Sequence, residues 1–114
     1  MTKIYKILPQ PEWTAALAKG QFAGSGIDLA DGFIHFSTAA QAPETARRHF
    51  AGQADLVVLR VDAERLGEAL RWEPSRGGEL FPHLYGALSC ALVEAVSAAS
   101  LGEDGVPALG DLPA

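Results

Sequence analysis

The sequence predicts an α+β fold in one small domain. Its 114 residues are enough for a single domain and too few for two. A hydrophobic content of 48% provides a core of ordinary size. Short extended segments and short helical segments also follow one another along the chain, without repeats. We expect residues 1–100 to form the globular domain. Residues 101–114 are rich in Gly, Pro and Asp, which predicts a poorly ordered tail.

The first part of the chain predicts a strand, a short helix and a loop. Residues 3–8 alternate in the manner of a strand. Pro11 suits the first turn of a helix in which Trp13 and Leu17, one turn apart, face the core. Gly20 is a typical helix end. Residues 21–32 have glycines at their centre and predict a loop.

The segment 31–38, Asp-Gly-Phe-Ile-His-Phe-Ser-Thr, predicts a strand that serves both core and site. Side chains alternate between the two faces of a strand. His35 therefore shares one face with Phe33 and Ser37. Ile34 and Phe36 lie on the opposite face, which we expect to pack on the core. The first face offers an imidazole and a hydroxyl beside an aromatic ring, a common lining for a small cleft.

The next segments predict a helix and a central strand. Thr38 and Gln41 resemble a capping box before a helix that ends near residue 50. Residues 55–61 include four consecutive apolar side chains, which indicates a strand buried on both faces in the middle of a sheet. Asp62 can cap the short helical turn that follows. Residues 70–73 alternate as a strand, and residues 74–78 predict a turn.

The last segments predict two more extended pieces. Residues 80–85 are extended, and we expect Pro82 to keep them away from the centre of a sheet. Phe81 and His83 then share one side. Residues 89–98 permit either a helix or a strand, and a strand is the prediction because the sheet needs a closing partner.

Composition limits the function classes. A net charge of −5 disfavours binding to long nucleic acids or to anionic membranes. No apolar run approaches the ~20 residues that a membrane span requires. No secretory signal begins the chain, and Cys90 is the only cysteine. We therefore predict a cytoplasmic protein whose partner is a small molecule or nucleotide. The oligomeric state stays open.

Three polar clusters are candidates for one binding cleft. His35 and His83 are the residues most suited to catalysis, since Pro82 holds His83 on a rigid backbone. His35, His49 and His83 with Glu79 could give a metal two histidines and a carboxylate, but their spacing matches no metal motif, so no metal is expected. The clusters are His35 with Ser37 and Thr38; Arg71 with Trp72 and Glu73; and Arg76 and Glu79 with Phe81, His83 and Tyr85.

These motifs resemble a known family. Asp-Gly-Phe-Ile-His-Phe-Ser-Thr (31–38), Arg-Trp-Glu (71–73) and Glu-Leu-Phe-Pro-His-Leu-Tyr-Gly (79–86), in that order, look like domain-of-unknown-function family 952, a family of small bacterial proteins. The likeness runs from about residue 4 to residue 96. The combination is specific, and the family name brings no reaction with it.

A more distant resemblance suggests chemistry. His-Phe-Ser (35–37), Thr-Ala-Arg (45–47) and the segment 56–62 are similar to the second half of the RNA 2′-phosphotransferases, which belong to the ADP-ribosyltransferase-like superfamily. The resemblance implies two short packed β-sheets, two to three helices and NAD in a cleft between the sheets. By this resemblance His35 lines the nicotinamide pocket, and Glu79 stands near the third signature position. The first position falls near Tyr5 or Lys6.

Three functions remain open. The first is an ADP-ribosyltransferase-like enzyme or NAD-binding protein whose cleft is lined by His35, Trp72, Glu79 and His83, with catalysis by His35, Glu79 and His83. The second is a non-enzymatic module that binds a small ligand or nucleotide. The third is a metal-dependent enzyme that uses His35 and His83. In the first case the ligand-binding residues are Ser37, Thr38, Arg71, Trp72, Glu73, Arg76, Phe81 and Tyr85.

Overall fold

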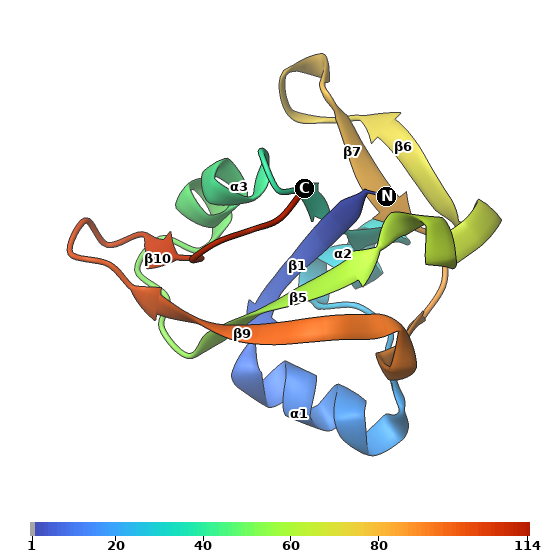
Figure 1. Cartoon of the computed structure of the whole chain (residues 1–114), viewed down its shortest axis with the longest axis horizontal. Coiled ribbons are helices and arrows are strands. Elements are labelled where there is room, and N and C mark those ends of the chain that lie inside the picture. Colours follow the sequence, from blue (N-terminus) through green and yellow to red (C-terminus); the bar gives the residue numbers. More distant parts are fainter. Residues whose placement is uncertain (1) are drawn as a thin grey trace.

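Strand β5 (Leu56–Asp62) lies in the middle of a five-stranded antiparallel sheet with the order β10-β9-β5-β1-β4 (Figure 1). It pairs with β1 (Lys3–Pro9) on one side and with β9 (Val93–Leu101) on the other. Residues 56–59 are all buried. The prediction of a central strand buried on both faces is confirmed.

The structure is a computed structural model, which describes residues 2–114 except for the side chain of Arg76. The remaining strands are β2 (Gln21–Phe22), β3 (Ile34–His35), β4 (Ser37–Thr38), β6 (Leu70–Pro74), β7 (Leu80–Leu84), β8 (Leu88–Ser89) and β10 (Pro107–Ala108). The α-helices are α1 (Gln10–Lys19), α2 (Gly26–Asp31) and α3 (Ala42–His49). Short 3₁₀ helices are η1 (Ala63–Ala69), η2 (Arg76–Gly78) and η3 (Cys90–Leu92).

The large sheet separates two hydrophobic cores. On one face Ile4 and Leu8 of β1 pack with Trp13 of α1. On the other face Tyr5 and Ile7 pack with residues of α3. Helices α1 and α3 accordingly lie on opposite sides of the sheet in Figure 1. The α+β class is confirmed by this arrangement, whereas the superfamily assignment stays a prediction.

The predicted strand over residues 31–38 is divided between two sheets. β3 pairs with β7 in a three-stranded sheet of order β3-β7-β6, and β4 pairs with β1 in the large sheet. Phe36 is the residue at the crossing. Ile34 and Phe36 are both buried, at 1% and 2% exposure, so the predicted core face is confirmed. The chain therefore joins the two sheets immediately after His35.

The position predicted for Pro82 is wrong, because β7 is the middle strand of its sheet. The Pro82 carbonyl accepts a hydrogen bond from the Phe36 N–H at 3.0 Å. The N–H and C=O of one residue in an antiparallel strand point to the same side. The N–H that proline lacks would therefore face the end of β3, where the ladder stops after His35. A proline is tolerated here because the lost bond lies beyond the paired residues.

Two helix predictions need correction. In α1, Trp13 is buried as predicted, but Leu17 is 54% exposed and Ala16 takes the inward position. The segment 21–32, predicted as a loop, contains α2. Ser25 and Asp28 stand at the N-cap and N3 positions of this helix, and a capping box stabilises a short helix even beside glycines.

The other helix predictions are met. The backbone N–H of Thr38 donates to Gln41 Oε1, and the Gln41 N–H donates to Thr38 Oγ1, before α3 begins. Asp62 accepts a hydrogen bond from the Glu64 N–H at the start of η1, as its capping role predicts. Helix η1 and strand β6 then follow in the predicted order. None of the helices in the part of the chain that the structure describes has the length and apolarity of a membrane span.

The C-terminal segment follows the strand prediction and continues beyond it. The strand over residues 89–98 is confirmed from Val93 onward, and it runs to Leu101 after a turn of 3₁₀ helix. In the segment predicted to be a poorly ordered tail, β10 pairs with β9 and Leu109 is buried. Tyr5 donates a hydrogen bond to the Pro113 carbonyl. The structure thus places this segment along the sheet and the second core.

Candidate functional site

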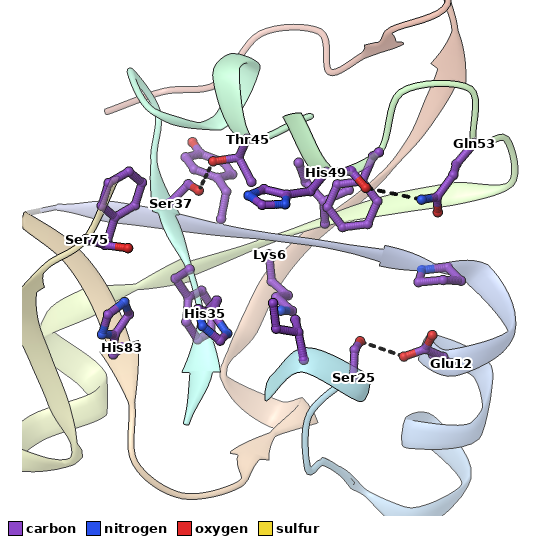
Figure 2. Close-up of a pocket in the computed structure, with 17 residues that line it drawn as sticks. Lys6, Glu12, Ser25, His35, Ser37, Thr45, His49, Gln53, Ser75 and His83 are labelled. Atoms are coloured by element: carbon purple, nitrogen blue, oxygen red, sulfur yellow. Dashed lines mark hydrogen bonds between the residues drawn. The ribbon is translucent and has the colours of Figure 1, made fainter. Parts of the chain in front are cut away.

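A cleft of about 430 Å³ lies beside β1 (Figure 2). β4 pairs only with Ile4 and Tyr5, so this edge of β1 carries no neighbouring strand from Lys6 onward. The cleft occupies that free edge, between α2 and β3 on one side and α3 on the other. A cavity of this size suits a small organic ligand. Its lining residues are Tyr5, Lys6, Ile7, Pro9, Glu12, Ser25, Ile27, His35, Phe36, Ser37, Thr45, His49, Phe50, Gln53, Ser75, Phe81 and His83.

All three histidines of the chain line this cleft. His35 and His83 are directly opposite each other in the β3–β7 ladder. Their ring centroids are 5.5 Å apart, in an edge-on arrangement. Phe33 stacks on the His83 ring at 4.1 Å and contacts the His35 ring at 4.5 Å. His49 comes from the end of α3, on the opposite wall in Figure 2.

Asp28 of α2 fixes the His35 ring. Its Oδ1 lies 2.6 Å from His35 Nδ1 and also accepts the His35 backbone N–H at 3.0 Å. The second ring nitrogen, Nε2, lies 3.0 Å from Oδ2 of Asp31. Asp28 is buried, whereas the Asp31 side chain is 45% exposed. The buried carboxylate therefore orients the ring, and the exposed one can give way to a ligand.

The Asp28 carboxylate also binds Lys6 in a buried ion pair. Lys6 Nζ lies 2.8 Å from Asp28 Oδ2, which further accepts the Ser25 N–H at 2.9 Å. Burial alone would raise the pKa of Asp28, but hydrogen bonds from His35 and Lys6 and the positive charge of Lys6 hold that pKa far below its ordinary value. Burial lowers the pKa of Lys6, against the attraction of Asp28 and Glu12. Asp28 is therefore ionised near neutral pH, and it acts on the cleft through the lining residues Lys6 and His35.

Glu73 of β6 orients His83 in the same manner. Its Oε1 lies 2.8 Å from His83 Nδ1 and accepts the Tyr85 hydroxyl, also at 2.8 Å. The hydrogen bond from His83, followed by that from Tyr85, lowers the pKa of Glu73. The same contact, accepted by a carboxylate, raises the pKa of Tyr85. Unlike Asp28, the Glu73 side chain is about one-third exposed, at 33%.

The Nε2 atom of His83 is available to a ligand. Among the described residues, Glu73 is its ring's hydrogen-bonding contact, and that contact is made through Nδ1. No buried side-chain nitrogen or oxygen in the described part of the chain lacks a partner. His83 is only 4% exposed and is among the residues that line the cleft, so its ring can contact a ligand there.

The predicted site residues are only partly brought together. His35, Ser37, Phe81 and His83 line the cleft, and the expected shared side of Phe81 and His83 is confirmed. Ser37 Oγ is 2.8 Å from Thr45 Oγ1 on α3. Behind His83 lie the predicted ligand-binding residues Glu73 and Tyr85, which support the ring but are not among the lining residues.

The other predicted residues lie away from the cleft. Thr38 and Glu79 both hydrogen-bond to Gln41, which ties the start of α3 to the segment before β7. The guanidinium of Arg71 lies over the Tyr85 ring, 4.8 Å from its centroid. Trp72 is 41% exposed and, by strand alternation, faces away from the side of β6 that carries Glu73. Of the four residues predicted to line the cleft, His35 and His83 are among the lining residues, and Trp72 and Glu79 are not. The side chain of Arg76 lies outside the described part of the chain.

Several residues of the site were not predicted from the sequence. Asp28, Glu12 and Ser25 were missed, and Lys6 was noted only through the superfamily resemblance. Ser25 and Asp28 form a Ser-x-x-Asp pattern, which predicts a helix start and could have shown that the loop contains a helix. No such signal exists for Glu12, whose Oε1 accepts the Ser25 hydroxyl at 2.6 Å.

The metal-dependent alternative finds no ligand set here. Within the described residues, no three His, Cys, Asp or Glu side chains are grouped so that they could hold a metal ion. Nδ1 of His35 and Nδ1 of His83 each lie within hydrogen-bond distance of a carboxylate, a contact that orients an imidazole ring. The candidate place for NAD is the cleft itself, and no other group of residues is proposed for it.

Comparison with known proteins identifies relatives of high similarity. The model of a family described as "Protein of unknown function (DUF952)" matches residues 7–96. The crystal structure of protein CC0527 from Caulobacter crescentus is 58% identical, with a TM-score of 0.94 and 96% of each chain covered. The solution NMR structure of CC0527 is also 58% identical, with a TM-score of 0.87, 97% of this chain and 96% of that chain covered. No curated protein matches the chain significantly.

Proposed function

We propose that the cleft of this chain, which belongs to the DUF952 family of proteins of unknown function, binds a small phosphate-bearing molecule. The first candidate for this ligand is a nucleotide. We further propose that His35 and His83 act on this ligand as an acid–base pair. The observation that carries the proposal is geometric. Two imidazoles, each held at Nδ1 by a carboxylate, lie opposite each other on paired strands at one cleft.

The chemistry of the lining favours an anion. The chain has a net charge of −5, yet all three of its histidines and the buried amine of Lys6 meet at this cleft. Imidazole N–H groups and hydroxyls are suitable donors to phosphate oxygens. Ser75 supplies a hydroxyl at the same surface, whereas the Thr45 hydroxyl donates to the Gln41 carbonyl and the Ser37 hydroxyl donates to Thr45 Oγ1. Aromatic side chains such as Phe36 and Phe81 give the cleft an apolar wall against which a flat base can pack.

The two histidines differ in a way that suits opposite roles. His83 donates from Nδ1 to Glu73 and presents Nε2 as a proton acceptor. His35 lies between Asp28 and Asp31, so a protonated ring donates to both carboxylates. His83 is therefore the general base and His35 the general acid. Asp28 and Glu73 are positioning residues, because each acts through a histidine.

Such a pair supports group transfer between two oxygen or nitrogen atoms. His83 Nε2 takes the proton from the attacking O–H as the new bond to the transferred group forms. His35 gives its proton from Nε2 to the leaving atom as the old bond breaks. One group has then moved, and one proton has passed from His35 to the leaving atom while His83 has gained one. Exchange with water restores both rings.

Histidine NMR tests the proposal directly. AMP is titrated into ¹⁵N-labelled protein, and adenosine, which lacks the phosphate, is the matched control ligand. We expect AMP to shift the ring signals of His35 and His83 saturably at sub-millimolar to millimolar concentration, with a much weaker response to adenosine. His83→Asn should reduce the affinity for AMP at least severalfold. Unchanged ring signals at 10 mM AMP and 10 mM inorganic phosphate would remove the proposal.

A non-enzymatic binding module shares the same cleft and the same donors. Turnover of phosphate esters and nucleotides, measured for the wild type and for His35→Asn, distinguishes a binding module from an enzyme. Saturable binding with no turnover above that of His35→Asn would assign the cleft to binding alone. Turnover that depends on both histidines supports the acid–base assignment.

NAD-dependent ADP-ribosyl transfer is the second candidate. It is favoured by one observation, that the cleft opens where the chain passes from one sheet to the other, with His35 at its wall. The aromatic wall would then be Phe81 and Phe36 in place of Trp72. The test is titration with NAD, followed by detection of released nicotinamide. Absence of saturable binding at millimolar NAD removes this candidate but leaves phosphate binding untouched.

A further inference from the structure

The cleft has two chemically different ends. His83 and Ser75 lie at one end in Figure 2, and Glu12 and Ser25 lie at the other, with Lys6 between them. The Ser75 hydroxyl at the His83 end can donate a hydrogen bond to an anion. The Glu12 end presents a carboxylate, which accepts hydrogen bonds and donates none. A ligand that fills the cleft must therefore carry acceptors at one end and donors at the other.

A hydrogen bond from Ser25 fixes the orientation of the Glu12 carboxylate. Oε1 accepts the Ser25 hydroxyl at 2.6 Å, so Ser25 fixes its direction from the N-terminal end of α2. The charge of Lys6 is already matched by Asp28 at 2.8 Å. Glu12 acts on Lys6 only through its charge, without an ion pair, so Glu12 adds a negative charge that the Lys6–Asp28 pair does not neutralise. Among the contacts of the described residues, Oε2 of Glu12 accepts no hydrogen bond.

We propose that Glu12 is a specificity-determining residue that selects a ligand with vicinal hydroxyl groups, namely the ribose of a nucleotide. This inference rests on the phosphate-binding function proposed above. A carboxylate accepts from two adjacent hydroxyls in the same plane, and an acidic side chain commonly serves ribose in this way. Ile7 and Phe50 add apolar lining to the cleft, which suits the flat faces of the base and sugar.

The test compares AMP with 2′,3′-dideoxy-AMP in calorimetric titrations of the wild type, Glu12→Gln and Glu68→Gln. Glu68 is an exposed glutamate of η1 and serves as the matched control. We expect the wild type to bind AMP about tenfold or more tightly than the dideoxy compound, as for hydrogen bonds to a charged acceptor. In Glu12→Gln this ratio should fall to about twofold, and Glu68→Gln should keep the wild-type ratio.

The outcomes separate the two proposals. Equal binding of AMP and dideoxy-AMP to the wild type overturns the role of Glu12 and leaves phosphate binding in place. Tighter binding of O-phosphoethanolamine than of AMP also overturns it, because Glu12 would then select an ammonium group. No binding of any of these compounds overturns the proposed function itself. Glutamine can still accept the Ser25 hydroxyl, and circular dichroism of Glu12→Gln checks that α2 is intact.

Discussion

Each of the two histidine–carboxylate pairs joins a carboxylate to Nδ1 of a histidine, but the surroundings of the two pairs differ. Asp28 holds His35 with a side chain that is 1% exposed, and Glu73 holds His83 with one that is 33% exposed. Asp28 also binds Lys6 and two backbone N–H groups, whereas Glu73 adds only the Tyr85 hydroxyl. The comparison indicates that Asp28 orients His35 and also supports the fold. Glu73 orients His83 from the solvent side.

Replacement of Asp28 by Asn should have the largest effect. It leaves the Lys6 ammonium without its counter-charge at a site where water cannot replace it. Breaking a buried ion pair in this way costs about 3–5 kcal/mol of unfolding free energy. Urea unfolding followed by circular dichroism measures the loss, with Glu73→Gln as the matched control. A loss as small as that of the control would show that Asp28 is not structurally distinct from Glu73.

Acid should unfold the protein through Asp28. Its folded-state pKa is far below the ordinary 3.8, so its contribution is fully present above pH 4 and is lost as the pH falls through the folded-state pKa. The loss for one such carboxylate is about 2–3 kcal/mol. Unfolding free energies between pH 7 and pH 2 measure it.

The variants assign this pH dependence. Asp28→Asn should show a much shallower decline below pH 4 than the wild type, and Glu73→Gln should decline nearly as the wild type does. Parallel curves for the wild type and Asp28→Asn would contradict the assignment.

Replacement of Lys6 by Met should cost less than replacement of Asp28. The carboxylate keeps its hydrogen bonds from His35 and from the Ser25 N–H. Burial of the ammonium is itself unfavourable, as the lowered pKa of Lys6 indicates, so its removal recovers part of the loss. We expect a decrease of about 1.5–3 kcal/mol, as for a hydrogen bond to a charged group. A loss equal to that of Asp28→Asn would mean that removal of the buried ammonium recovers no free energy.

Replacement of Glu73 by Gln should have the smallest effect on stability and a clear effect on His83. The exposed carboxylate contributes little to folding, so the urea midpoint should stay within error of the wild type. Loss of the carboxylate that contacts Nδ1 should change the NMR chemical shifts of the His83 ring, while those of the His35 ring stay unchanged. A shift of both rings, or of neither, would contradict the separate roles of Asp28 and Glu73.

The parts of the fold that were predicted depend on patterns within a few residues. Four consecutive apolar residues identified β5 as a central strand, and alternation placed Ile34 and Phe36 in the core. Errors arose where a neighbour outside the segment decided the outcome. Leu17 has the hydropathy of a core residue but faces solvent. Pro82 lies in a middle strand because β3 ends beside it.

The site residues were also predicted only in part. His35 and His83 were identified from their local surroundings, and antiparallel pairing places them opposite each other. Trp72 and Glu79 were grouped with them through closeness in the chain and through the resemblance. Alternation along β6 turns Trp72 away, and Gln41 holds Glu79 outside the cleft. Closeness in sequence does not determine which side of a hairpin a residue faces.

The sequence by itself determined the α+β class, the central position of β5 and the choice of His35 and His83 as candidate site residues. These inferences succeed because hydrophobic periodicity and proline chemistry act over a few residues. Only the tertiary structure decided that Asp28 and Lys6 form one buried pair beneath His35, and that the short β4 leaves an open edge for the cleft. These features join residues from separate elements. The strength of the Lys6–Asp28 interaction depends on the low polarity of its surroundings. Those surroundings form only when the sheets and helices have packed.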